Sequence, residues 1–198
     1  MRLEAVVAVL IAFAAMGALP RIFFRKDGRL NLRWWLTASP FFASAVFVAL
    51  SFAGIVPVVD TGSGRALGVA ALALAMTSLA LITFTLGTHR IPLALWHQDN
   101  DDPAEIVTWG AYRRIRHPFY TSFSLVLLAA FVLAPSVLTA VCLVAGVVGL
   151  GIAARREEGR LARSPFGREY EAYMATTGRF LPKLGGGSHR EPAPTRQS

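Results

Sequence analysis

Long apolar runs constrain the fold of this chain more than any other feature of its sequence. About 20 apolar residues cross the hydrocarbon core of a bilayer as a single helix. We therefore expect five membrane helices, at residues 3–19, 34–59, 66–86, 119–134 and 136–154. The chain is 54% hydrophobic and only 16% charged, whereas soluble domains average about 25% charged residues. The sequence predicts an all-α, polytopic membrane protein with about five transmembrane helices and a cytoplasmic C-terminal helical segment.

The first and fourth runs are shorter than the others. We expect both to take in flanking residues or to lie where the bilayer is thinned. The first run could also be the apolar part of a signal peptide. However, the sequence Pro-Arg-Ile-Phe-Phe-Arg at residues 20–25 is a poor match to a small-residue cleavage site. We expect this run to be a retained helix.

The distribution of basic residues predicts the orientation in the membrane. Of the 20 Lys and Arg residues, 18 would lie on one side of a five-helix bundle, in segments 21–33, 87–118 and 155–198. The positive-inside rule makes that side the cytoplasm and places the N-terminus outside, which fits a cell (inner) membrane protein. A basic surface that faces anionic lipid explains the net charge of +8 without a nucleic-acid partner.

Three parts are expected along the chain. Residues 1–88 would form three transmembrane helices, residues 89–184 a core with a helical hairpin, and residues 185–198 a disordered tail. The short connection Ala-Pro-Ser at 134–136 forces the last two membrane helices into a tight antiparallel hairpin. This hairpin should bring the polar segment around residues 113–120 beside the polar segment at 155–173.

A metal site is not expected. The loop at residues 88–111 contains His97 near several aspartates, but these acids lack the spacing of metal ligands. Cys142 is the only cysteine in the chain, so neither an intrachain disulfide nor a cysteine-based metal site can form.

Residues 109–120 place a dense polar cluster directly before the fourth apolar run. Pro118 disfavours helical geometry at His117 and suits the first turn of a helix, so we expect the helix to begin there. The free N–H groups of that helix start, together with Arg113, Arg114 and Arg116, favour a carboxylate or a phosphate. Snorkelling of the arginines to the interface and helix capping explain the same residues equally well.

Glu157 and Glu158 are expected just beyond the fifth helix, where acidic side chains oppose the helix dipole. The neighbouring arginines can offset this charge. Alternatively, one glutamate binds an ammonium group or a pair of ribose hydroxyls. The stretch 166–173 is then expected to form a short amphipathic helix whose aromatic residues lie on the membrane surface or cover a ligand.

Over roughly residues 86–184 the sequence resembles the integral-membrane methyltransferases, namely the isoprenylcysteine carboxyl methyltransferases and the related phospholipid N-methyltransferases. The residues that carry the resemblance are Tyr112-Arg113-Arg114-Ile115-Arg116-His117-Pro118-Phe119-Tyr120, Glu157-Glu158-x-x-Leu161, Phe166-Gly167-x-Glu169-Tyr170-x-x-Tyr173 and Arg179-Phe180-Leu181-Pro182.

This resemblance implies S-adenosylmethionine as the cofactor, in a pocket that faces the cytoplasm. His117, Pro118 and Tyr120 would line the pocket, and Glu157 or Glu158 would bind polar groups of the cofactor. Tyr170 and Tyr173 would help to enclose it.

Two positions depart from the family pattern. Ser122 stands where relatives usually carry glycine, and Thr176-Thr177-Gly178 stands where they often carry Arg-Val-Pro. Because the arginine of that motif could anchor a substrate carboxylate, its replacement by Thr176 weakens the case for prenylcysteine as the substrate. Arg116 or Arg179 could take the same role.

The resemblance and the residues together predict a methyltransferase that acts on a lipophilic small molecule or lipid in the membrane. The favoured reaction is O-methylation of a carboxylate, with Arg116, His117 and Arg179 as the candidate catalytic residues. N-methylation of an aminophospholipid and S-methylation of a small thiol remain alternatives, for which His117 would be the base. A non-catalytic membrane protein that binds anionic lipid or a partner is the alternative from another class.

Overall fold

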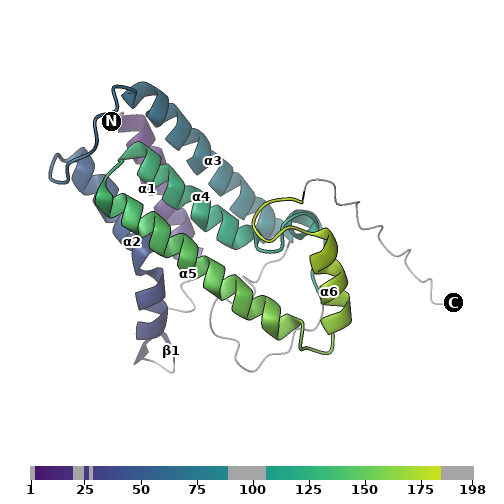
Figure 1. The fold of residues 1–198 in the computed structure, drawn as a ribbon. Helices are drawn as coiled ribbons and strands as arrows, with labels where there is room; N and C mark the ends of the chain where they lie inside the picture. Colours follow the sequence, from purple (N-terminus) through teal and green to yellow (C-terminus); the bar gives the residue numbers. More distant parts are fainter. Residues whose placement is uncertain (1–2, 20–24, 27–28, 89–105, 184–198) are drawn as a thin grey trace.

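The described residues of this protein are mostly helical. The structure, a computed structural model, describes residues 3–19, 25–26, 29–88 and 106–183 (Figure 1). Within these ranges the strands are β1 (Arg25–Lys26) and β2 (Arg29–Leu30), which pair antiparallel. The all-α class is therefore confirmed. The loop that carries His97 and the tail at 185–198 lie outside the described residues.

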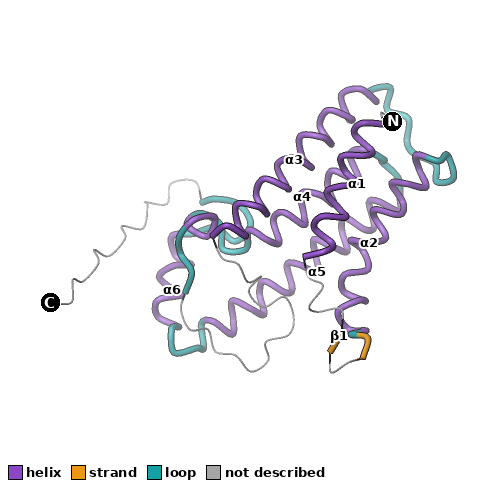
Figure 2. The backbone as a smooth tube through the Cα atoms, turned by 180° about the vertical axis from the view of Figure 1, so that it is seen from behind, coloured by secondary structure: helices purple, strands orange, loops and turns teal. Residues whose placement is uncertain are grey.

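Five long helices lie side by side and a shorter sixth helix lies at one end of them (Figures 1 and 2). The five are α1 (Leu3–Ala18), α2 (Leu32–Phe52), α3 (Gly64–Thr88), α4 (Pro118–Leu133) and α5 (Val137–Leu161). The sixth is α6 (Gly167–Thr176), and a 3-10 turn, η2 (Gly110–Arg113), precedes α4. The main packing contacts join α3 to α4, α2 to α5 and α1 to α3.

Three of these helices, α2, α3 and α5, are long and apolar enough to cross a membrane. α1 and α4 are also apolar but have 16 residues each, which corresponds to a length of about 24 Å. Large apolar side chains such as Val144, Val148 and Phe84 are more than half exposed. Exposed apolar side chains along helices of this length are typical of surfaces that contact lipid.

The second helix ends earlier than its apolar run predicts. α2 ends at Phe52 rather than near residue 59, because the chain turns at Gly54, which has a φ of +77°. Glycine adopts this left-handed conformation without steric cost. At its other end, α2 begins at Leu32, where the side chain of Asn31 accepts a hydrogen bond from the Trp34 backbone N–H at 3.3 Å.

The fifth helix is longer than predicted. The expectation that Glu157 and Glu158 lie beyond its end is wrong, because α5 continues to Leu161. The sequence Arg-Arg-Glu-Glu that follows the apolar run consists of good helix formers, so the helix continues after its hydrophobicity ends. Both glutamates therefore project from a rigid helix rather than from a loop.

The predicted hairpin between α4 and α5 is present. α4 ends at Leu133 and α5 begins at Val137. A capping box closes the turn, with the Ser136 hydroxyl accepting from the Thr139 backbone N–H at 3.2 Å. The start of α4 and the end of α5 consequently lie at the same end of the bundle, next to α6 (Figure 1).

Candidate functional site

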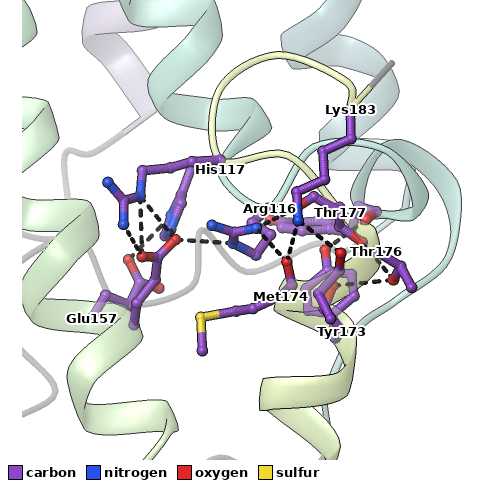
Figure 3. A network of polar contacts seen from close by, with 12 residues as sticks. Arg116, His117, Glu157, Tyr173, Met174, Thr176, Thr177 and Lys183 are labelled. Carbon is purple, nitrogen blue, oxygen red and sulfur yellow. Dashed lines mark hydrogen bonds and ion pairs between the residues drawn. The ribbon is translucent and has the colours of Figure 1, made fainter. Parts of the chain in front are cut away.

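A polar cluster forms where three segments meet at the α6 end of the bundle (Figure 3). The start of α4 contributes residues 116–120, the end of α5 contributes Glu157 and Glu158, and the segment after α6 contributes Arg179. The side chains come from sequence positions up to 63 residues apart. The close approach of the two polar segments that the hairpin predicted is therefore observed.

The backbone around His117 fixes the position of the cluster. His117 is the N-cap of α4, with a φ of −124° and a ψ of 62°, and Pro118 opens the helix. The chain after α6 runs alongside this segment. The Arg116 N–H donates to the Gly178 carbonyl at 2.8 Å, and the His117 N–H donates to the Arg179 carbonyl at 3.0 Å. Arg179 is thereby held beside the start of α4.

Glycine is required at position 178. A Cβ atom on Gly178 would collide with the carbonyl oxygen of Leu181, so the turn closes only around a residue without a side chain. The Thr121 hydroxyl adds a hydrogen bond to the Phe180 carbonyl at 2.9 Å. Neither Gly178 nor Thr121 was among the residues predicted for the site. For Gly178, the glycine directly before the Arg-Phe-Leu-Pro motif was the available signal.

Glu158 is the most heavily paired side chain of the cluster. Its carboxylate accepts from Arg116 Nε at 2.9 Å and from Arg179 Nε at 3.0 Å. Only 7% of the Glu158 side chain is exposed. Two guanidinium groups therefore compensate a buried carboxylate, as burial of a charge demands.

Arg116 connects Glu158 to the C-terminal segment. Besides its bond to Glu158, its Nη1 donates to the carbonyl oxygens of Met174, at 3.3 Å, and Thr177 (Figure 3). Its side chain is only 9% exposed. In this structure Arg116 therefore holds the end of α6 against α5, because its donors bond to Glu158 and to two carbonyl oxygens there.

Glu157 has different partners. It accepts a hydrogen bond from the Tyr120 hydroxyl at 3.1 Å, and its Oε2 lies 3.7 Å from His117 Nδ1. Its side chain is 15% exposed, about twice the exposed fraction of Glu158. The two glutamates are adjacent in sequence but differ in accessibility and in the groups that hold them.

The His117 imidazole lies between the two glutamates. It stacks on the Tyr120 ring with centroids 5.2 Å apart and an interplanar angle of 5°. Its Nε2 lies 3.3 Å from Glu158 Oε1, within ion-pairing distance. Within the part of the chain that the structure describes, His117 Nε2 is buried and has no well-aligned hydrogen-bond partner.

Tyr170 and Tyr173 lie on α6 in a small buried cluster with Ile106. The Tyr173 hydroxyl donates to the Tyr112 carbonyl at 2.5 Å and so joins α6 to η2. Burial raises the pKa of both tyrosines above the ordinary value, so both stay protonated at neutral pH. Each is 3% exposed, so in this structure both side chains pack in the interior and help to hold α6 in place.

Of the two arginines that pair with Glu158, Arg179 is the more accessible. Its side chain is 36% exposed, and its hydrogen bond to Glu158 raises its pKa further above the usual value. The other departure from the family pattern, Ser122, is fully buried in α4 and bonds to the Pro118 carbonyl at 3.0 Å. A serine is therefore accommodated there without disturbing the helix start.

Comparisons with protein-family models, with curated proteins and with solved structures find no match for this chain. The site is therefore characterised by its own geometry: a helix start, two glutamates, a buried histidine and one accessible arginine, all at one end of an apolar bundle.

Proposed function

We propose that this protein is an S-adenosylmethionine-dependent methyltransferase that acts on a lipophilic acceptor in the membrane, with a carboxylate as the favoured acceptor group. The position of Glu157 carries the proposal. It is a partly accessible carboxylate on a rigid helix, beside the start of α4 and the buried His117, whose Nε2 has no well-aligned hydrogen-bond partner among the described residues.

These groups fit the polar parts of the cofactor. Glu157 suits a cationic ammonium or ribose hydroxyls, whereas Glu158 already pairs with Arg116 and Arg179. His117, as the N-cap of α4, makes no side-chain capping bond, and N–H groups at a helix start favour a carboxylate. Pro118 and Tyr120 would contribute to the same wall. Tyr170 and Tyr173 would act indirectly, by holding α6 in place.

The cofactor, when bound, supplies an electrophilic methyl group for an in-line displacement. Such a reaction depends chiefly on alignment, and positioning contributes about 7–11 kcal/mol in favourable cases. An ionised carboxylate acceptor needs only a cation to orient it, and Arg179 is the accessible one in the cluster. For an ammonium or thiol acceptor, His117, which lies between the two carboxylates of α5, would be the base.

We further propose five membrane spans with the polar cluster on the cytoplasmic side of the cell membrane. α1 and α4 are shorter apolar helices that pack within the same bundle as the three longer helices. Exposed arginines gather at the α6 end, including Arg113, Arg155 and Arg156. The positive-inside rule assigns such an end to the cytoplasm.

Binding of S-adenosylmethionine tests the proposal directly. The full-length protein in lipid nanodiscs should bind S-adenosylmethionine in isothermal titration calorimetry, and Glu157→Gln should weaken the affinity about tenfold, the loss of one charged contact. Glu171→Gln, an exposed acid on α6, is the matched control and should bind normally.

If the folded wild-type protein binds no S-adenosylmethionine in any lipid composition, the enzyme proposal is wrong. A protein that instead associates only with anionic vesicles, in a manner suppressed by salt, would be the non-catalytic lipid-binding alternative.

A further inference from the structure

A cavity lies among α1, α2, α4 and α5, and it shares no lining residue with the polar cluster. It contains about 600 Å³ of space that no atom fills, part of which is open to the outside. Aromatic side chains form much of its wall: Trp34, Phe41 and Phe42 from α2, and Phe123 from α4.

The chemistry of the lining disfavours a polar occupant. Among the described residues that line the cavity none is ionisable, and the one hydroxyl, that of Thr37, donates to the Trp34 carbonyl at 2.8 Å. Apart from the indole N–H of Trp34, a polar ligand would find no side-chain group in this lining to replace its lost hydration, which is costly. A hydrocarbon loses nothing by entering such a space.

The walls of the cavity belong to helices suited to a bilayer. α2 and α5 both have the length and hydropathy of membrane spans. The medium next to a cavity at this level is therefore expected to be lipid. Since lipid tails are already apolar, entry of a chain would be selected by van der Waals fit rather than by the hydrophobic effect.

Two glycines on the α5 wall have different roles. A Cβ atom on Gly146 would meet Leu127 Cδ1 at 2.5 Å, so any side chain there would require Leu127 to shift at the contact between α5 and α4. A Cβ atom on Gly149 would have no heavy atom within 4 Å, although Gly149 lines the cavity. The missing side chain of Gly149 thus preserves open space.

We propose that this cavity binds one hydrocarbon chain of a membrane lipid, and that Gly149 keeps it open. This binding does not require that the protein transfer methyl groups. The cavity and the polar cluster nevertheless share α4 and α5. Phe123 follows Tyr120 by three residues and Leu150 precedes Glu157 by seven, which are about 5 and 10 Å along the helices. The polar end of a bound lipid would therefore lie close to the cluster.

Photo-crosslinking tests the proposal in the full-length protein. The probe is a phosphatidylcholine with a diazirine in one acyl chain, diluted into unlabelled phosphatidylcholine vesicles. After irradiation, peptide mass spectrometry should locate more probe on Phe41 and Phe42 than on Val144, which faces outward with 63% exposure. Gly149→Leu should reduce the labelling of the cavity about tenfold while leaving Val144 labelled.

Matched variants separate filling of the cavity from general damage. Gly151→Leu is the control, because a Cβ atom there also meets open space but Gly151 does not line the cavity. Ala38→Leu fills the cavity from α2, and Ser39→Leu is its outward-facing control. If Gly149→Leu does not give a monodisperse protein, the comparison of Ala38→Leu with Ser39→Leu tests the proposal instead. Labelling of the cavity no stronger than that of Val144, or labelling that survives the filling variants, would overturn the proposal.

Discussion

Arg116 and Arg179 both pair with the Glu158 carboxylate but differ in their exposure and in their other hydrogen bonds. Arg116 is buried and spans from Glu158 to two carbonyl oxygens at the end of α6. Arg179 is partly exposed, and its side-chain hydrogen bonds lead only to Glu158 among the interactions described. We infer that Arg116 holds the C-terminal segment in place, whereas Arg179 can exchange Glu158 for the carboxylate of an acceptor.

Replacement of Arg116 should therefore destabilise the protein. Arg116→Met deletes the hydrogen bonds to the Met174 and Thr177 carbonyls and removes one of the cations beside buried Glu158, which should lower the free energy of unfolding by at least about 2 kcal/mol. Thermal unfolding in detergent, followed by circular dichroism, measures the effect. Arg113→Met, at an exposed position on η2, should leave the melting temperature unchanged. Equal melting temperatures for both variants would refute the role given to Arg116.

Removal of the Tyr120 hydroxyl should affect ligand binding more than stability. Tyr120→Phe keeps the ring that stacks on His117 but deletes the 3.1 Å hydrogen bond to Glu157. We expect a loss of about 1 kcal/mol in stability and a several-fold weaker affinity for S-adenosylmethionine, because Glu157 is no longer oriented. Ser124→Ala removes a hydroxyl from the same helix and serves as the control. Normal affinity in Tyr120→Phe would show that this orientation is unimportant.

At the scale of the elements, the segment after α6 is held by backbone bonds to residues 114–117 and by a glycine turn. Gly178→Ala should displace this segment, because the new Cβ atom cannot avoid the Leu181 carbonyl oxygen. Hydrogen exchange at Arg116 and His117, whose N–H groups bond to this segment, should become much faster. Gly159→Ala on α5 is the control, since its Cβ would meet only the Arg163 side chain at 3.7 Å. Unchanged exchange in Gly178→Ala would contradict the steric argument.

The positions of the helices can be predicted from the sequence, whereas some of their ends and their rotations cannot. Hydrophobicity located all five apolar helices, because each apolar run forms one helix. It misplaced the ends of α2 and α5, where Gly54 and a run of charged helix formers decide the boundary. The short hairpin loop was enough to predict that His117 and the glutamates meet. Which glutamate pairs with Arg116 depends on the rotation of α5, and no local pattern encodes that rotation.

At the scale of the whole molecule, the proposed topology places the α2–α3 connection and the α6 segment on opposite sides of the membrane. In a Cys142→Ala background, a cysteine at Thr61, which is exposed in that connection, should react with an impermeant maleimide added outside intact cells. A cysteine at the exposed Arg168 on α6 should react only after the cells are opened. The reverse pattern would contradict the proposed orientation.

The central claim is that the polar cluster transfers methyl groups to a lipid, and the transfer itself tests it most directly. The purified full-length protein would be incubated with methyl-labelled S-adenosylmethionine and a total lipid extract of the expressing cells. Label in the lipid would be counted, and the volatile labelled methanol that mild alkali releases from this lipid would be measured. We predict labelled lipid whose methyl group alkali releases, as for a methyl ester, and about tenfold less product from Glu157→Gln. Label in the lipid that alkali does not release as methanol would indicate N- or S-methylation instead. No labelled lipid from the folded wild-type protein would contradict the claim.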